Sequence, residues 1–570
     1  MTQTAATAET QHLLRAVTSL REEVAGSTLP LDLPDVAVSQ GARTELLRQL
    51  DDYVIPRLSS LDAPLLAVVG GSTGAGKSTL VNSLVGSVVS RPGVLRPTTR
   101  SPVLVHHPGD EAWFRDARVL PDLARVTGGG ATEGESSVRL VSSGTMPAGL
   151  AILDAPDIDS VVEHNRDLAR QLLSAADLWL FVTTAARYAD AVPWDLLRQA
   201  SERGTSIAVV LDRVPPEALD EIREHLASML REHGLAAAPI FTIAESRLTQ
   251  DGLLPDEQIN RLRSWLTALA KDVKARAIVV RQTLTGALDS LESRTEILTQ
   301  ASTAQLGATT ALLAAADTAY AGAVDGVRQG MTDGALLRGE VLARWQEFVG
   351  TGEFFKQVES TVSRARDRLV ALVKGQPAPS QDLGEALQSG VSELIRAEAQ
   401  GAASVTSRTW RTLVGGASLL EAHPDLPRVS PDFEVRVNSL VHDWQGDVLE
   451  LVRNEGADRR TTARVTAYGV NAVGTVLILV TFAQTGGLTG AEAGIAGGTA
   501  ILGQKLLEAI FGDQAVRTLA TKARQALIER VEQLYFEEQG RFRAAVDTVE
   551  IRRDQGRRLA SAALAVKVAR

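Results

Sequence analysis

Residues 65–78 read LLAVVGGSTGAGKS, and this stretch decides the fold of the front part of the chain. It is an apolar run followed by glycines, and Gly71–Ser78 fits the spacing GxxxxGK[ST] just ahead of a helical sequence. Glycine lets the backbone wrap closely around an anion, so that successive N–H groups point inward. The following helix adds the positive end of its dipole. We therefore predict a strand, a phosphate-binding loop and a helix.

Two residues of this loop and one downstream aspartate are expected to bind the phosphates and the metal of a nucleotide. Lys77 should reach the β- and γ-phosphates of a bound nucleotide, and Ser78 should ligate Mg²⁺. The apolar run 150–153, LAIL, ends in Asp154, the place where a Walker-B aspartate holds the magnesium shell. Together these pieces favour a phosphate-loop nucleotidase.

A polar loop lies between these two motifs. Residues 96–100 read RPTTR and precede the apolar run 103–106. The hydroxyl of Thr98 or Thr99 could close over the γ-phosphate and the metal, as the first switch of GTPases does. Capping or turn formation is the alternative interpretation of these threonines.

The third and fourth motifs of GTPases are both altered. The third, DxxG, ends here in Asp157, so a carboxylate replaces the glycine whose N–H senses the γ-phosphate. That carboxylate repels a triphosphate unless it turns away or helps to hold the metal or water. The fourth, [NT]KxD, reads Asp212, Arg213, Val214 and Pro215. Arg213 can stack on a purine, but the guanine-reading carboxylate is replaced, which leaves guanine and adenine both open.

These motifs define three sets of predicted site residues. The nucleotide-binding set is Gly71, Ser72, Thr73, Gly74, Ala75, Gly76, Lys77, Ser78, Thr79, Asp154, Asp212 and Arg213. The metal set is Ser78, Thr99 and Asp154. The catalytic set is Lys77, Thr98, Thr99 and Asp157, with Asp159 as a second acidic candidate for activating water.

Apolar periodicity divides the chain into an α/β part and a helical part. Short apolar runs alternate with helical stretches in the first part, which is typical of a mainly parallel sheet. The predicted strands are 65–69, 103–106, 150–153, 178–182, 207–211 and 240–243. Beyond them, leucines at helical spacing predict a long helical region. The predicted domains are an N-terminal helical segment that packs with the neck (1–62), the phosphate-loop domain (63–272), a helical neck and trunk (273–464), an apolar helical hairpin or tip (465–511) and returning C-terminal helices (512–570).

Composition excludes several classes of protein. The chain has 570 residues, 44% hydrophobic and 22% charged, which is typical of a multidomain globular protein. It has no cysteine, which excludes disulfides and thiolate sites and fits a reducing compartment. The net charge of −10 argues against general nucleic-acid binding. We therefore expect a cytoplasmic chain with no nucleic-acid partner.

The segment from Val465 to Gln504 carries a single charge, Glu492. A transmembrane helix, a helical hairpin entering lipid from one side, and a buried helix pair in a protein core all fit this pattern. Glycine recurs at every fourth position from 486 to 498, which favours close helix packing in lipid. The flanking basic residues suit an anionic headgroup layer at the inner face of the cell membrane. The residues expected to form the membrane-contacting tip are Val476, Leu477, Ile478, Leu479, Phe482 and Leu488.

The motifs GGSTGAGKST at 70–79, RPTTRSPV at 96–103 and LDAPD at 153–157, followed by a helical region with an apolar tip, resemble the bacterial dynamin-like proteins. The stretch ALLRGEVLARWQEFVGTGEFFKQVES also looks like actinobacterial members. The resemblance implies a Mg²⁺-dependent GTPase that binds GTP and GDP, self-associates as a homodimer or higher oligomer, and remodels membranes. It also implies that a paralogous dynamin-like protein could be a partner. Dynamins commonly carry a serine that holds a charge-compensating cation where this chain has Gly74.

Two other functions compete with this hypothesis. A GTPase of RNA or ribosome maturation would use the helical part to bind nucleic acid, which the negative net charge and few aromatic residues disfavour. A nucleotide-binding membrane scaffold with little hydrolysis fits the altered third and fourth motifs.

Overall fold

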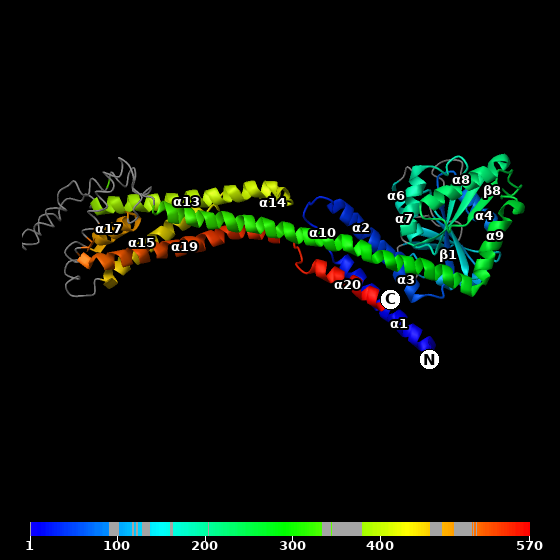
Figure 1. Ribbon diagram of the computed structural model, residues 1–570, viewed down its shortest axis with the longest axis horizontal. Coiled ribbons are helices and arrows are strands. Elements are labelled where there is room, and N and C mark those ends of the chain that lie inside the picture. The colour runs from blue at the N-terminus through cyan, green and yellow to red at the C-terminus, as the bar shows by residue number, and fades with distance from the viewer. Residues whose placement is uncertain are drawn as a thin grey trace, which may run out of the picture. The chain divides into compact units, whose positions relative to one another are not determined.

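The computed structural model describes most of the chain and divides it into two compact units (Figure 1). The first unit comprises Met1–Leu29, Asp35–Ala304 and Arg552–Arg570, and the second comprises Pro30–Pro34 and Gln305–Ile551. The described residues are 2–90, 102–116, 119–120, 123–127, 137–159, 163–202, 204–332, 344, 379–455, 470–483, 504, 507–508 and 510–570.

The first unit is built on an eight-stranded sheet with the order β3-β4-β2-β5-β1-β6-β7-β8. Neighbouring strands are parallel except β2 and β5, which are antiparallel. The strands are β1 (Leu65–Gly71), β2 (Val103–His106), β3 (Ala124–Thr127), β4 (Ser137–Ser142), β5 (Leu150–Asp154), β6 (Leu178–Thr184), β7 (Ser206–Val214) and β8 (Ile240–Ala244). The predicted α/β fold with a mainly parallel sheet is confirmed.

The central strands are buried on both faces, which explains why their sequences are continuous apolar runs rather than alternating ones. Alternate residues of β1 belong to separate core clusters: Leu66 and Val68 to one, Leu65 and Ala67 to the other. The helices that flank the sheet are α4 (Lys77–Val85), α5 (Glu111–Arg115), α6 (Glu163–Ser174), α7 (Ala191–Glu202), α8 (Leu219–Glu232) and α9 (Asp256–Lys271).

All six predicted strands are present, but β3 and β4 were missed. Most of β3 is exposed or half-buried, and it carries Arg125, so its sequence lacks the apolar signal of a central strand. β4 carries Arg139 in its middle. These strands form one edge of the sheet, where solvent tolerates charged side chains.

Four long helical segments of the first unit share a separate apolar core, to which residues 50–58 also contribute. They are α1 (Thr2–Ala25), α2 (Val36–Gln49), the first part of α10 (Val273–Gly330) and α20 (Gln555–Ala569). Figure 1 shows α1 and α20 side by side, and the two helices are in contact. One turn of π-helix at Leu50–Val54 joins α2 to α3 (Ile55–Ser59). The two ends of the chain therefore meet in one helical bundle.

The second unit is entirely helical in its described part. It contains the remainder of α10 with α13 (Pro379–Thr412), α14 (Gly416–Ala422), α15 (Phe433–Glu455), α17 (Val470–Ala483) and α19 (Asp513–Asp547). The apolar face predicted for α19 is confirmed, because all six of its predicted residues are buried: Val516, Leu519, Ala523, Leu527, Val531 and Leu534. The predicted helical region is therefore confirmed.

Five of the six residues predicted to form the membrane-contacting tip lie in α17, and other helices cover them in this structure. α17 contacts α13, α15 and α19, and none of its five predicted tip residues is more than 5% exposed: Val476, Leu477, Ile478, Leu479 and Phe482. A helix that is apolar all round is buried either in a protein core or in a membrane, and here other helices cover it. These residues form part of a protein core, as the buried-helix interpretation expected. Leu488 lies outside the described residues.

Within the described residues, none of the helices combines the length and the apolar character needed to span a bilayer.

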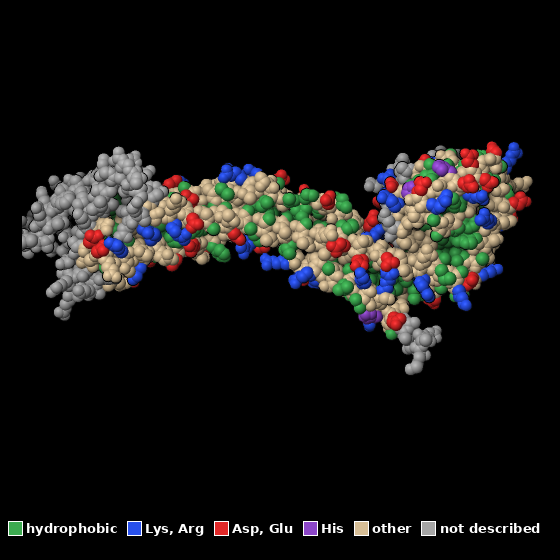
Figure 2. All heavy atoms as spheres, viewed as in Figure 1, with side chains coloured by type: hydrophobic (Ala, Val, Ile, Leu, Met, Phe, Trp, Pro, Cys, Tyr) green, Lys and Arg blue, Asp and Glu red, His purple; other side chains and the backbone are tan. Residues whose placement is uncertain are grey.

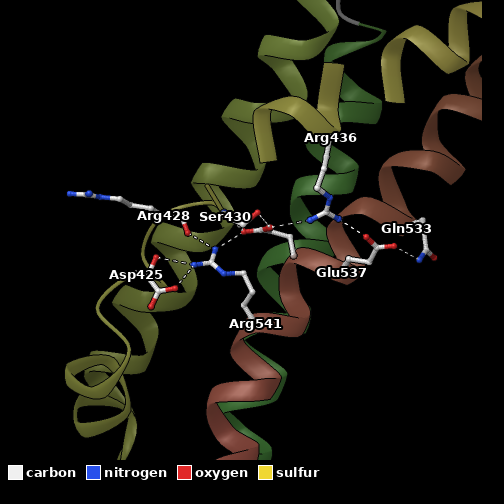
Figure 3. Close-up of polar contacts among 8 residues, drawn as sticks. Asp425, Arg428, Ser430, Arg436, Gln533, Glu537 and Arg541 are labelled. Carbon is white, nitrogen blue, oxygen red and sulfur yellow. Dashed lines mark hydrogen bonds and ion pairs between the residues drawn. The ribbon is translucent and has the colours of Figure 1, made fainter. Parts of the chain in front are cut away.

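A buried carboxylate fastens the loop between α14 and α15 to α19. Glu538 is 1% exposed and accepts hydrogen bonds from the backbone N–H of Ser430 (2.7 Å), from the Ser430 hydroxyl (2.8 Å) and from Arg541 (2.6 Å). Figure 3 shows Arg541 also directed at Asp425, whose carboxylate accepts a bond of 2.9 Å. The cluster compensates the buried charge with donors from both elements.

We predict that Glu538→Gln destabilises the protein by about 3 kcal/mol, because it leaves Arg541 without its buried partner. The matched control is Glu537→Gln. Glu537 is the neighbouring residue, half-exposed and paired with Arg436, so its loss should cost less than about 1 kcal/mol. Urea unfolding followed by circular dichroism measures both values. Equal costs for the two variants would contradict this role of Glu538.

Candidate nucleotide-binding site

The phosphate loop lies where the sequence placed it, between the carboxyl end of β1 and the start of α4. Gly71 is pressed against the neighbouring strand, and a Cβ there would collide with the carbonyl oxygen of Val182. Gly76 has a left-handed φ of 88°, and a Cβ there would lie 2.5 Å from a carboxylate oxygen of Asp212. Both positions therefore require glycine.

The Lys77 ammonium lies inside the loop and uses all three of its donors. The side chain is 6% exposed, and Nζ donates to the carbonyl oxygens of Gly71 (2.9 Å) and Ser72 (3.0 Å). It also forms an ion pair with Asp157. A phosphate that binds Lys77 must take over the donor now engaged by this carboxylate.

Asp154 lies buried at the end of β5, with one oxygen bonded and one not. The Ser90 hydroxyl donates to its Oδ2 at 2.6 Å, while Oδ1 has no hydrogen-bond partner among the described residues. Burial raises the pKa of Asp154, and the hydroxyls of Ser90 and Ser78 act in the opposite direction. The unsatisfied oxygen beside Ser78 fits the donor set of a Mg²⁺ ion that takes its remaining ligands from phosphate and water. The described residues contain no group of three or more acidic or histidine side chains able to hold a metal.

A second ion pair lies at the outer edge of the loop, and its arginine was missed. Both the N–H and the hydroxyl of Thr73 donate to Asp159 Oδ1 at 2.6 Å. Arg187 donates to Asp159 Oδ2 (2.8 Å), to the carbonyl oxygen of Thr73 (2.9 Å) and to Asp190 (2.9 Å). Burial raises the pKa of Asp159, but the bonds from Thr73 and the Arg187 charge outweigh it, so this pKa lies below its usual value. The one sequence feature that could have identified Arg187 as a site residue is its position just after the predicted strand 178–182.

The altered fourth motif lies against the other side of the loop. Asp212 is 6% exposed, and its carboxylate faces Gly76. Burial raises the pKa of Asp212, and the neighbouring Arg213 opposes the shift. Arg213 has a left-handed φ of 54°, and its guanidinium also approaches Gly76. These two residues therefore pack against the phosphate loop, a contact that the sequence analysis did not predict; their predicted role in nucleotide binding stays a prediction.

The structure thus brings together the loop residues with Asp154, Asp157, Asp212 and Arg213. Thr98 and Thr99 lie outside the described residues. The assembled site offers a buried cation, a row of loop N–H groups at a helix N-terminus and a free carboxylate oxygen. This combination can bind a phosphate chain together with a divalent metal.

Residues 66–214, which include all of these groups, match the model of the Dynamin family. They form a dynamin-family domain. The resemblance drawn from the phosphate-loop motifs is thereby confirmed, although the third and fourth motifs of this dynamin-family domain are altered. A comparison with curated proteins finds no significant match.

Solved structures similar to this chain include a bacterial dynamin and two other proteins. The first belongs to an oligomerised bacterial dynamin pair described as sensing and tethering membranes at long range; it has 10% identity, covers 97% of this chain and 95% of its own, and gives a TM-score of 0.48. The second is Aquifex aeolicus Era bound to GDP and aluminium fluoride. It has 19% identity, the match covers 36% of this chain and 57% of Era, and the TM-score is 0.24. The third is Arabidopsis thaliana Toc33 with GDP and Mg²⁺. It has 18% identity, the match covers 41% of this chain and 93% of Toc33, and the TM-score is 0.24.

The buried Asp154 in the dynamin-family domain generates a prediction about stability. Because burial raises its pKa above the unfolded value of about 3.9, the charge destabilises the folded state increasingly as pH rises. Without metal, Asp154→Asn should therefore raise Tm at pH 7, and this gain should shrink as pH falls and vanish below about pH 3, where the aspartate is protonated in both the folded and the unfolded state. Thermal melting from about pH 3 to about pH 8 measures this difference in Tm.

The control for this experiment is Asp195→Asn, on an exposed aspartate of α7, which should leave Tm unchanged. A lower Tm for Asp154→Asn at pH 7 would contradict the interpretation.

Proposed function

We propose that this protein is a dynamin-like GTPase that binds GTP with Mg²⁺, hydrolyses it, and couples hydrolysis to self-association and membrane binding. The observation that supports nucleotide binding most directly is the joint placement of Lys77, Ser78 and the free oxygen of Asp154 in a dynamin-family domain. In this proposal Lys77 binds the β- and γ-phosphates, and Ser78 and Asp154 hold the metal. The metal would neutralise charge on the phosphates.

The choice of guanine rests on the family match, because the fourth motif lacks its carboxylate at Pro215. Asp212 faces Gly76, so it serves the phosphate loop in this proposal. Arg213 is the group available to stack on the base. Binding of GTP and ATP by the same protein sample therefore tests the base independently of hydrolysis.

We predict that the protein releases phosphate from GTP in a Mg²⁺-dependent way and that Lys77→Ala lowers this rate at least about 100-fold. The matched control is Lys274→Ala, an exposed lysine of α10, which should keep the parent rate. If the parent protein binds GTP but releases phosphate only at the background rate, hydrolysis is rejected and the nucleotide-binding scaffold remains. Binding of ATP but not GTP would reject the GTPase assignment.

The distribution of charged side chains bears on the competing nucleic-acid hypothesis. Figure 2 shows basic and acidic side chains mixed over both units on the face in view. A nucleic-acid-binding surface usually gathers basic side chains on one face. We therefore keep the membrane as the proposed partner, with the inner face of the cell membrane as its location.

The membrane part of the proposal concerns the uncharged segment that includes α17. Because the side chains of α17 are already buried, they can reach lipid only if this helix leaves α13, α15 and α19. Such a move exchanges one apolar environment for another, so the burial of apolar surface changes little. Release of α17 is thus the step to test.

We predict that a disulfide between Gly474→Cys in α17 and Leu449→Cys in α15 abolishes binding to anionic liposomes. A Cβ at Gly474 would collide with Leu449 Cδ2, so the two positions face each other closely and replacing Leu449 by the smaller cysteine relieves the clash. The natural sequence has no cysteine that could compete. Liposome co-sedimentation should fail under oxidising conditions and recover with reductant. The single variant Leu449→Cys, which cannot form the disulfide and adds no Cβ at Gly474, is the control. Equal sedimentation of the oxidised and reduced double variant would reject release of α17.

A further inference from the structure

The phosphate loop carries two ion pairs that have the same architecture. In each, a carboxylate from the segment after β5 engages a cation at the loop: Asp157 engages Lys77, and Asp159 engages Arg187. Lys77 belongs to the loop itself, whereas Arg187 comes from the turn that follows β6, the strand next to β1. The loop therefore has a second cation that its own motif does not supply.

Arg187 is attached to the loop through the main chain. One guanidinium nitrogen donates to the carbonyl oxygen of Thr73 at 2.9 Å, and a second donates to Asp159 at 2.8 Å. The side chain is 38% exposed, so it is neither locked in the core nor free in solvent. Arg213 approaches the same loop at Gly76 instead. The two arginines therefore occupy different ends of the loop.

The charge that develops during GTP hydrolysis explains why a second cation matters. Hydrolysis of GTP forms a bond from the water oxygen to the γ-phosphorus and breaks the bond from that phosphorus to the bridging oxygen. The electron pair of the broken bond stays on the β-phosphate of GDP, and the proton of the water passes to the released phosphate. Negative charge thus grows at the bridging oxygen, and a fixed cation stabilises it. Gly74 stands next to Thr73 and has no side chain for this task.

We propose that Arg187 is a catalytic arginine, supplied in cis, for the hydrolysis assigned above. This inference rests on the proposed function. The entering γ-phosphate competes with Asp159 for the Thr73 N–H and for the guanidinium. Once Asp159 is displaced, Arg187 donates its freed N–H to phosphate oxygens while its bond to the Thr73 carbonyl keeps it at the loop. Asp159 thereby holds the arginine in place before the nucleotide binds.

A purely structural role would give a different pattern, because Arg187 would then act only by holding Asp159 against Thr73. The variant Asp159→Asn separates the two roles. It removes the charge that retains Arg187 but keeps an oxygen that accepts from Thr73. If Arg187 is catalytic, Asp159→Asn still captures GDP with aluminium fluoride. If Arg187 only positions Asp159, this variant loses capture as fully as Arg187→Ala does. Capture is compared rather than turnover, because Asp159 is itself a candidate for activating water.

The experiment compares Arg187→Ala, Asp159→Asn and the control Arg198→Ala, an exposed arginine of α7 that pairs with Asp195. We measure kcat for GTP, the Kd of GDP and of a non-hydrolysable GTP analogue, and the capture of GDP with aluminium fluoride. Arg187→Ala should lower kcat by about 10³-fold and prevent aluminium fluoride capture, with both Kd values within about threefold of the parent. Added guanidinium should restore part of the rate.

Three outcomes would overturn the inference. The first is an unchanged kcat in Arg187→Ala. The second is a loss of GDP and analogue binding large enough to account for the whole rate change. The third is an equal loss of aluminium fluoride capture in Arg187→Ala and Asp159→Asn. A parent protein that does not hydrolyse GTP rejects the proposed function instead, and the inference falls with it. Hydrolysis by the parent with an unaffected Arg187→Ala rejects only the inference.

Discussion

The environment of the Lys77 ammonium is the constraint on which the rest of the site depends. Two of its donors are held by loop carbonyls and the third by Asp157, so the cation is buried without being unsatisfied. Burial of a charge is tolerated only with such partners. A phosphate that approaches Lys77 competes with this carboxylate, because both are negatively charged acceptors for the same cation. This links occupancy of the loop to the position of the segment after β5, which also carries Asp159 and thereby holds Arg187.

The helical part also buries groups only where suitable partners surround them. Glu538 is buried because donors from α19 and from the loop before α15 surround it, and α17 is apolar all round because three helices cover it. One arrangement satisfies charge and the other removes apolar surface from water. If α17 contacts lipid, it must give up packing that the second unit uses for its own core.

Most of the fold was predictable because its signals are local. The P loop, the six apolar strands and the amphipathic face of α19 each follow from spacing within a short stretch of chain. β3 and β4 were not found, because edge strands such as Ala124–Thr127 can carry arginine without cost. Arg187 was not found either, because nothing near it in the sequence identifies its partners Thr73 and Asp159, which lie far away along the chain.

The sequence by itself determined the phosphate loop, the aspartate that ends β5 and the division into an α/β and a helical part, because glycine geometry and apolar period act over a few residues. Only the tertiary structure decided that Asp157 neutralises Lys77, that Asp212 braces Gly76 and that α17 is covered by its neighbours. Ion pairs and burial depend on which segments meet in space, and an uncharged run looks the same whether lipid or protein surrounds it.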